Sequence, residues 1–139
     1  MIVRPYKPTD YDQIKALYLD SSLFGGQFDE ARDSESRLKK KIEVDPDTIL
    51  VAEKEGRLIG TISVIDDGRV AWLFRYAAQK EQDEALKALH DKAIAVLKNR
   101  GHKQVLVYTP VGNVELNSRY EQLGFTKGGD YTCYWKEIS

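Results

Sequence analysis

The spacing of apolar residues along the chain changes from a helical to an extended period and then back. In the N-terminal third, apolar residues recur three and four positions apart, which is the spacing of one face of an α-helix. The residues with this spacing are Ile14, Leu17 and Tyr18 and, further on, Leu38 and Ile42. They predict a first helix that ends before Gly25-Gly26 and a second, mostly solvated helix over residues 28–44. The prolines on either side of Tyr6 leave room only for a short strand, residues 2–4, before the first helix.

Three β-branched or aromatic segments occupy the middle of the chain, at residues 48–53, 58–65 and 70–76. Short turns that contain Gly56 and Gly68 separate them. Extended segments joined by such turns pair most simply with their neighbours in sequence. The pattern therefore predicts a three-stranded antiparallel meander.

A helical period returns after the meander, at Leu86, Leu89, Ala93 and Leu97. Gly101 stands where a left-handed C-terminal cap is expected. Residues 104–109 are predicted to form a strand parallel to the strand before this helix. A further helix from about residue 113 to Gly124 and a last strand, residues 131–138, complete the chain.

The resulting order, βααβββαβαβ, predicts a single α/β (α+β) domain over residues 1–139, with a mixed central sheet and helices on both faces. The chain carries 21 Lys and Arg against 22 Asp and Glu. A net charge so close to zero provides no general attraction to nucleic acid or to anionic lipid. Neither is therefore expected as a partner.

The single cysteine and the short apolar runs further narrow the class of protein that the sequence predicts. Cys133 is the only cysteine, which excludes an internal disulfide, argues against a cysteine-based zinc site and predicts a small buried residue in the last strand. Apolar runs such as residues 49–52 are far shorter than the roughly 20 residues that a membrane helix needs. The first residues do not resemble a secretory signal. A soluble, cytoplasmic protein without a metal site is predicted.

Several stretches of the chain, together with the order of its elements, resemble the GCN5-related N-acetyltransferase (GNAT) family. Residues 2–10 look like the family's first strand and helix entry, and residues 49–53 and 58–62 look like its second and third strands. The most specific match is to the family's fourth-helix pattern. The residues of this chain that match the pattern are Asn113, Tyr120 and the pair Gly124-Phe125.

The resemblance implies transfer of an acetyl group from acetyl-CoA to an amine, without a covalent enzyme intermediate. It implies that Tyr120 donates a proton to the departing thiolate and that Asn113 contacts the cofactor. The residues themselves also allow a core-edge tyrosine and an ordinary helix N-cap. In the family, backbone groups at the end of the fourth strand, here Phe74, Arg75 and Tyr76, bind the acetyl group and pantetheine. Strand alternation predicts that Arg75 lies on the face opposite to the other two side chains.

The segment that matches the family's pyrophosphate-binding loop departs from the family pattern. Its residues are Glu81, Gln82, Asp83, Glu84, Ala85 and Leu86, with none of the expected glycines. A carboxylate about 5 Å from a phosphate repels it by roughly 1–3 kcal/mol. The acids are also explained without any ligand, because carboxylates in a first helical turn complement the helix dipole. Lys80 and Lys87 flank the segment and offset part of its charge.

A general base and an acceptor site are less clearly marked. Glu53 and Asp66 are candidate bases acting through water, or else solvated charges at strand ends, and His90 and His102 are expected at the surface. Acidic residues surround residues 21–26, where the family often shapes its acceptor site, and are expected to attract cationic amines. These residues are Asp20, Asp29, Glu30 and Asp33.

The leading prediction is an acetyl-CoA-dependent N-acetyltransferase acting on the amine of a small molecule or peptide. A non-catalytic GNAT-fold binding or regulatory domain is the first alternative, because the altered loop weakens the expected cofactor site. An enzyme with an acyl donor that lacks pyrophosphate is the second. Monomer and homodimer are both compatible with the sequence.

Overall fold

The computed structural model describes residues 1–20 and 27–139. These residues form two compact units, Met1–Val107 and Tyr108–Ser139. The first unit contains the β-sheet and its covering helices, and the second contains one helix and irregular chain. None of the helices in the described ranges is long and apolar enough to cross a membrane.

The sheet of the first unit has four strands in the order β1-β2-β3-β4, all antiparallel to their neighbours. The strands are β1 (Ile2–Pro5), β2 (Ile49–Lys54), β3 (Arg57–Asp66) and β4 (Ala71–Ala78). The predicted short first strand and three-stranded meander are therefore confirmed. Adjacent named strands are antiparallel, and the parallel pairing that the predicted mixed sheet requires occurs at the bridge between Trp72 and Leu106.

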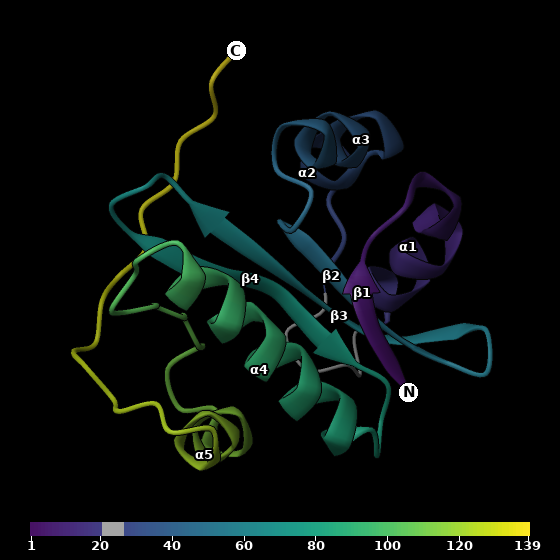
Figure 1. The fold of residues 1–139 in the computed structure, drawn as a ribbon. Coiled ribbons are helices and arrows are strands. Elements are labelled where there is room, and N and C mark those ends of the chain that lie inside the picture. The colour runs from purple at the N-terminus through teal and green to yellow at the C-terminus, as the bar shows by residue number, and fades with distance from the viewer. Residues whose placement is uncertain (21–26) are drawn as a thin grey trace. The chain divides into compact units, whose positions relative to one another are not determined.

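Helices cover both faces of the sheet, as predicted (Figure 1). Helix α4 (Asp83–Asn99) lies on one face, where Leu89 packs so closely on Gly60 that an added Cβ would be 3.0 Å from its side chain. Helices α1 (Tyr11–Leu19) and α3 (Glu35–Val44) cover the opposite face. Alternation of side chains along β2 accounts for the two cores.

The core on the α1 face joins residues from five elements and the segment before α1. Its members are Tyr6, Ile14, Leu17, Tyr18, Leu38, Ile49, Val51, Leu58 and Ala77. These include most of the apolar positions whose helical spacing was recognisable in the N-terminal third of the sequence. Burial of this face is what holds the short α1 and α3 helices in place, since isolated helices of this length are marginal in water.

The start of α1 and the predicted second helix differ from expectation. A short 3₁₀ turn, η1 (Pro8–Asp10), precedes α1. The predicted helix over residues 28–44 is divided into α2 (Glu30–Asp33) and α3. Ser34 is extended, with φ −63° and ψ 154°, and its hydroxyl accepts a hydrogen bond from the Arg37 amide. Ser34 therefore starts a new helix as its N-cap, because its side chain competes for backbone groups that a continuous helix would use.

The predicted strand over residues 104–109 is reduced to a single bridge. Leu106 pairs with Trp72 in parallel orientation. The Leu73 amide donates to the Leu106 carbonyl at 2.9 Å, and the Leu106 amide donates to Ala71 at 3.0 Å. The parallel direction was predicted correctly, but the length was not. A strand extends only as far as a neighbour continues its hydrogen bonds, whatever its β propensity.

The second unit contains α5 (Val114–Gln122), which begins and ends close to the predicted residues. No strand occurs in the unit as described, so the strand predicted over residues 131–138 is wrong. Its large apolar and aromatic side chains are exposed: Tyr131, Tyr134, Trp135 and Ile138. Cys133 is also exposed rather than buried. Aromatic composition predicts a strand only when a partner strand and a packed face are available.

Candidate functional site

Strand β4 contains an extra residue relative to β3. Thr61 pairs with Ala77 and Ser63 pairs with Phe74, so two steps along β3 correspond to three along β4. Within this bulge, Arg75 has a left-handed backbone with φ 48°. This conformation is costly for a residue that carries a Cβ, and such residues gather at functional sites. β-Bulges likewise occur beside active sites, where they redirect side chains.

The bulge changes which side chains share a face of β4. The Arg75 guanidinium lies 4.6 Å from the centre of the Phe74 ring and 5.8 Å from that of Tyr18, a residue of α1. Phe74 and Arg75 therefore point to the same side. The Tyr76 hydroxyl donates to the Leu86 carbonyl of α4 and so points to the other side. The predicted placement of Arg75 opposite to Phe74 is wrong, because the extra residue breaks the alternation of the strand.

Arg75 forms a buried ion pair with Asp33 of α2. Its Nε donates to Oδ1 at 3.2 Å and its Nη2 to Oδ2 at 2.7 Å. The exposed fractions of the two side chains are only 6% and 3%, respectively. The Asp29 amide also donates to the Asp33 carboxylate, at 2.9 Å. This fork of two parallel bonds is the strongest form of Arg–carboxylate pairing.

The ion pair alters the expected acidic acceptor region. The Asp33 carboxylate is paired with Arg75 and so is not free to bind an acceptor. The Asp29 side chain caps α2 by accepting a hydrogen bond from the Ala31 amide. Asp20 is the C-cap of α1, and Glu30 is exposed. Residues 21–26, which the prediction places at the centre of this region, lie outside the described residues. Attraction of cationic acceptors by these acids remains a prediction.

The predicted pyrophosphate segment forms the entry to α4. Glu81 is left-handed, with φ 67°, and Gln82 is the N-cap. The amides of Ala85 and Leu86 both donate to the Gln82 carbonyl, at 3.1 and 3.2 Å. The side chains of Ala85 and Leu86 are buried in the core rather than turned towards a ligand.

This entry does not fit a pyrophosphate as the family's loop does. Phosphate at a helix N-terminus needs outward backbone N–H groups, small residues and a favourable field. The amides of Ala85 and Leu86 are already hydrogen-bonded to the Gln82 carbonyl. Three exposed carboxylates surround the start of the helix: Glu81, Asp83 and Glu84. Of the flanking cations, Lys87 is paired with Asp91 at 2.7 Å, and Lys80 is exposed. The bulge of β4, in contrast, fits the backbone role that the family assigns to this strand.

In the second unit, Tyr120 lies in α5 and Asn113 immediately precedes this helix. Burial raises the pKa of the Tyr120 phenol to about 12, so the residue keeps its proton at neutral pH. Its ring packs edge-on against Phe125, with 5.5 Å between ring centres. The Asn113 side chain accepts from the Leu116 amide at 3.0 Å. Asn113 is therefore the N-cap that the sequence allowed, and its contact with a cofactor remains a prediction.

The two candidate bases are both ion-paired rather than solvated. Arg4 donates to Glu53 at 3.1 Å and also binds Asp10. Hydrogen bonds from the Gly68 amide and then from Arg100 and His102 hold the pKa of Asp66 below its usual range. A lowered pKa makes Asp66 a weaker base.

The histidines are not the surface residues that were expected. The His102 side chain is 9% exposed and lies 2.8 Å from Asp66, whereas the His90 side chain is 12% exposed and lies 2.9 Å from Asp91. Each is therefore held by a carboxylate. Across residues 1–20 and 27–139, no group of three or more His, Cys, Asp or Glu is arranged to hold a metal ion.

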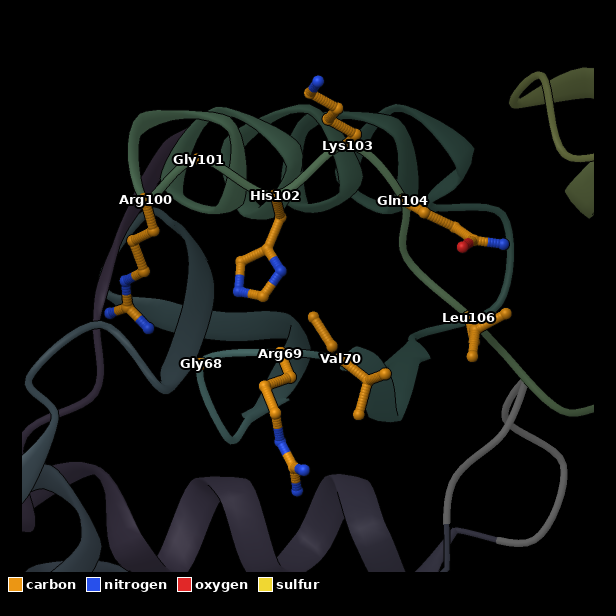
Figure 2. A pocket seen from close by; sticks show the side chains of 10 residues that line it. Gly68, Arg69, Val70, Arg100, Gly101, His102, Lys103, Gln104 and Leu106 are labelled. Atoms are coloured by element: carbon orange, nitrogen blue, oxygen red, sulfur yellow. The ribbon is translucent and has the colours of Figure 1, made fainter.

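A cavity of about 260 Å³ lies between the β3–β4 turn and the loop after α4. Figure 2 shows Arg100 and His102 projecting from this loop towards the turn, while Lys103 points away. The residues that line the cavity include Val70, Ala71 and Leu106. None of the residues predicted to bind the cofactor or to act as the general acid lines it. Among the arginines that line the cavity, Arg100 is paired with Asp45 and Asp66, and Arg69 is paired with Asp67. The cavity therefore shares no lining residue with the bulge at residues 74–76.

The sequence matches the model of the Acetyltransferase (GNAT) family over residues 11–125. The chain therefore belongs to the GNAT acetyltransferase family. No protein of curated function matches the sequence closely enough to count as a relative.

Solved structures agree on the fold at low sequence identity. An aminoglycoside 6'-N-acetyltransferase, AAC(6')-IG from Acinetobacter haemolyticus, has a TM-score of 0.71 and 16% identity, with 100% of both chains covered. A ribosomal-protein-alanine N-acetyltransferase from Brucella melitensis has a TM-score of 0.74 and 18% identity, over 93% of this chain and 86% of that one. Rv2747 from Mycobacterium tuberculosis, solved in complex with CoA, has a TM-score of 0.64 and 17% identity, over 87% and 70%.

Proposed function

We propose that the chain is an N-acetyltransferase that moves an acetyl group from acetyl-CoA to an amine by direct attack. The observation that carries this proposal is the bulge of β4, with Arg75 left-handed and outside the regular pairing with β3. A family member has no need of a metal or nucleophilic side chain for this chemistry. It needs backbone donors, an acceptor amine and an acid.

Backbone groups at Phe74, Arg75 and Tyr76 have the role of binding and polarising the acyl carbonyl in this proposal. A bulge interrupts the regular ladder, so its N–H groups are available in directions that a regular strand does not offer. Donors fixed by the fold stabilise a developing oxyanion without having to reorganise during the reaction. Acetyl-CoA, when bound, supplies the activated thioester.

Tyr120 has the role of the acid. Its pKa of about 12 means that the phenol is protonated throughout the physiological range, as a proton donor must be. Asn113 is proposed as a cofactor contact in addition to its role as N-cap. The proposed acetyltransferase domain comprises residues 1–139 and therefore both compact units.

The acceptor is proposed to be a small-molecule or protein amine. Two structural neighbours are named for these two acceptor classes, an aminoglycoside and a ribosomal protein. Four acids near residues 21–26 favour a cationic acceptor, although Asp33 is neutralised by Arg75. Cytoplasmic location is proposed from the single cysteine.

A non-catalytic binding domain is the second candidate, and the carboxylates at the α4 entry favour it. A decisive experiment first titrates the protein with acetyl-CoA and with S-acetylpantetheine, which lacks the pyrophosphate, by calorimetry. Thiol release is then measured with polyamine, aminoglycoside and peptide acceptors. Acceptor-dependent thiol release supports the enzyme. Saturable binding without transfer, or no binding at all, supports the non-catalytic domain.

The same two donors test the second alternative, an acyl donor without pyrophosphate. If the α4 entry contributes affinity, acetyl-CoA binds more tightly than S-acetylpantetheine. Equal dissociation constants, with transfer from both donors, would show that the pyrophosphate is not recognised.

A further inference from the structure

Asp33 and Arg75 connect two elements that are far apart in the sequence. Asp33 is in α2, a helix of four residues, and Arg75 is the left-handed residue of the β4 bulge. Both side chains are buried and are joined by two hydrogen bonds, and the Arg75 guanidinium also contacts the rings of Tyr18 and Phe74. The pair is therefore a direct link between α2 and the bulge.

Helix α2 depends on Asp33 for its position. A single helical turn is not stable alone, since nucleation costs more than one hydrogen bond returns. The Asp33 carboxylate accepts from the Asp29 amide and from Arg75, and its carbonyl accepts from the Tyr11 hydroxyl at 3.0 Å. Asp33 thus binds α2 to α1, to β4 and to its own first turn.

Arg75 depends equally on Asp33. A left-handed non-glycine residue persists only where its surroundings impose that conformation. The guanidinium cannot leave the α1 face without giving up its fork to Asp33 and its contacts with the Phe74 and Tyr18 rings. A buried guanidinium without its carboxylate would be an uncompensated charge. Loss of Asp33 therefore removes the main reason for residue 75 to remain left-handed.

We propose that Asp33 is a positioning residue, which through its buried fork to Arg75 holds residue 75 left-handed and so fixes the bulge of β4 at which acyl transfer takes place. This inference rests on the proposed function for its catalytic consequence. Its structural part, the dependence of the bulge on Asp33, is independent of any activity. Asp33 acts on the donor side of the reaction rather than as an acid that attracts the acceptor.

The first test compares Arg75→Gly with Arg75→Ala. Both remove the ion pair and leave the same unpaired Asp33, but only glycine adopts a positive φ without strain. We expect kcat per folded molecule to be about tenfold higher in Arg75→Gly than in Arg75→Ala. Equal kcat in the two variants would overturn the proposal, because the left-handed conformation would then have no catalytic importance.

The second test is a double-mutant cycle with Asp33→Asn. In the parent background we expect kcat to fall about tenfold with the KM of the acceptor changed less than twofold. In the Arg75→Gly background we expect Asp33→Asn to change kcat less than twofold, because no cation is left to hold. An increase in acceptor KM at constant kcat would instead make Asp33 an acceptor-binding acid. Asp130→Asn, which removes an exposed pair with Lys127 (3.3 Å), is the matched control and leaves both constants unchanged.

The third test needs no activity. In NMR spectra of the unliganded protein, Asp33→Asn is expected to shift the backbone amide signals of residues 74–76 and the Arg75 Nε–H signal, while those of β2 stay in place. Unshifted signals at residues 74–76 would overturn the inference even in an active enzyme.

If the parent neither binds acetyl-CoA nor transfers acetyl groups, the proposed function fails, and the NMR result still decides whether Asp33 holds the bulge. If Asp33→Asn does not fold, the double variant Asp33→Asn/Arg75→Gly, which lacks both charges, is used in its place. Its NMR spectrum is then compared with that of Arg75→Gly.

Discussion

Tyr120 shows how one residue is given a chemical role by its surroundings. Burial raises the pKa of its phenol to about 12, which stabilises the protonated form by disfavouring the charged one. The sequence supplied the match to the family's acid, and it left a core-edge tyrosine equally possible. The structure adds the burial, which serves both roles, so only kinetics separates them.

We expect Tyr120→Phe to lower kcat by about 10²–10⁴-fold, the usual contribution of a positioned acid, with little change in the dissociation constant of acetyl-CoA. Rapid-quench kinetics and calorimetry provide the two quantities. Tyr131→Phe is the matched control, since Tyr131 is 78% exposed in the same unit, and it should behave as the parent. A Tyr120→Phe enzyme with unchanged turnover, measured where chemistry limits the rate, would leave Tyr120 as a packing residue.

At the scale of the element, the entry to α4 is the least usual feature of this family member. Glu81 is left-handed without being glycine, and Gln82 provides no side-chain hydrogen bond as N-cap. The entry therefore combines backbone strain with negative charge. Relief of both at once requires only the replacement of Glu81 by glycine.

We expect Glu81→Gly to raise the free energy of unfolding by about 0.4–1 kcal/mol, because glycine tolerates φ 67°. It should also lower the dissociation constant of CoA about three- to tenfold at low salt, because one carboxylate is removed from the phosphate region. Urea unfolding and calorimetry measure the two effects.

Glu55 offers a matched control for this prediction. It is exposed, also left-handed with φ 52°, and lies in the β2–β3 turn away from α4. Glu55→Gly should produce a similar gain in stability with no change in CoA affinity. If both variants bind CoA as the parent does, the entry to α4 is not the phosphate site.

At the scale of the whole molecule, the first unit is held together by an ion-pair network as well as by its cores. Arg100, at the C-terminal end of α4, binds Asp45 at 2.7 Å and Asp66 at 3.1 Å. It therefore connects the ends of α3, β3 and α4. The hydrogen bond from Arg100 is the main reason that the pKa of Asp45 is below its ordinary value.

This network predicts an acid-sensitive stability. A carboxylate with a lowered pKa in the folded state contributes stability above the unfolded value of about 3.9, and this contribution is lost as the pH falls through the lowered value. We expect Arg100→Gln to lower the free energy of unfolding by about 1–2 kcal/mol at pH 7 and by much less at an acid pH below the lowered pKa of Asp45, where this carboxyl group is protonated in the parent too. Urea unfolding at the two pH values tests this.

Arg69→Gln is the control, because it removes a pair with Asp67 in which the arginine side chain is 87% exposed. Such surface pairs contribute about 0–1 kcal/mol. A parent and an Arg100→Gln variant that lose stability in parallel as the pH falls from 7 through the lowered pKa of Asp45 would contradict the role assigned to the network.

Local sequence determined the helices, the meander and the caps of this protein, because these depend on residues that are neighbours along the chain. The 3.6-residue period located α1 and α4, the turns at Gly56 and Gly68 defined the meander, and Asn113 capped α5 as its side chain allowed. The match to the family's fourth-helix pattern also came from a short stretch. Periodicity and capping need no knowledge of distant contacts.

Only the tertiary structure decided the features that depend on distant partners. The predicted strands at residues 104–109 and 131–138 had suitable composition, yet one became a single bridge and the other irregular chain. The β4 bulge placed Arg75 on the same face as Phe74, and its partner Asp33 lies 42 positions away in the sequence. No local pattern marks such a pair, because register, bulge and buried ion pair arise when the sheet and α2 pack together.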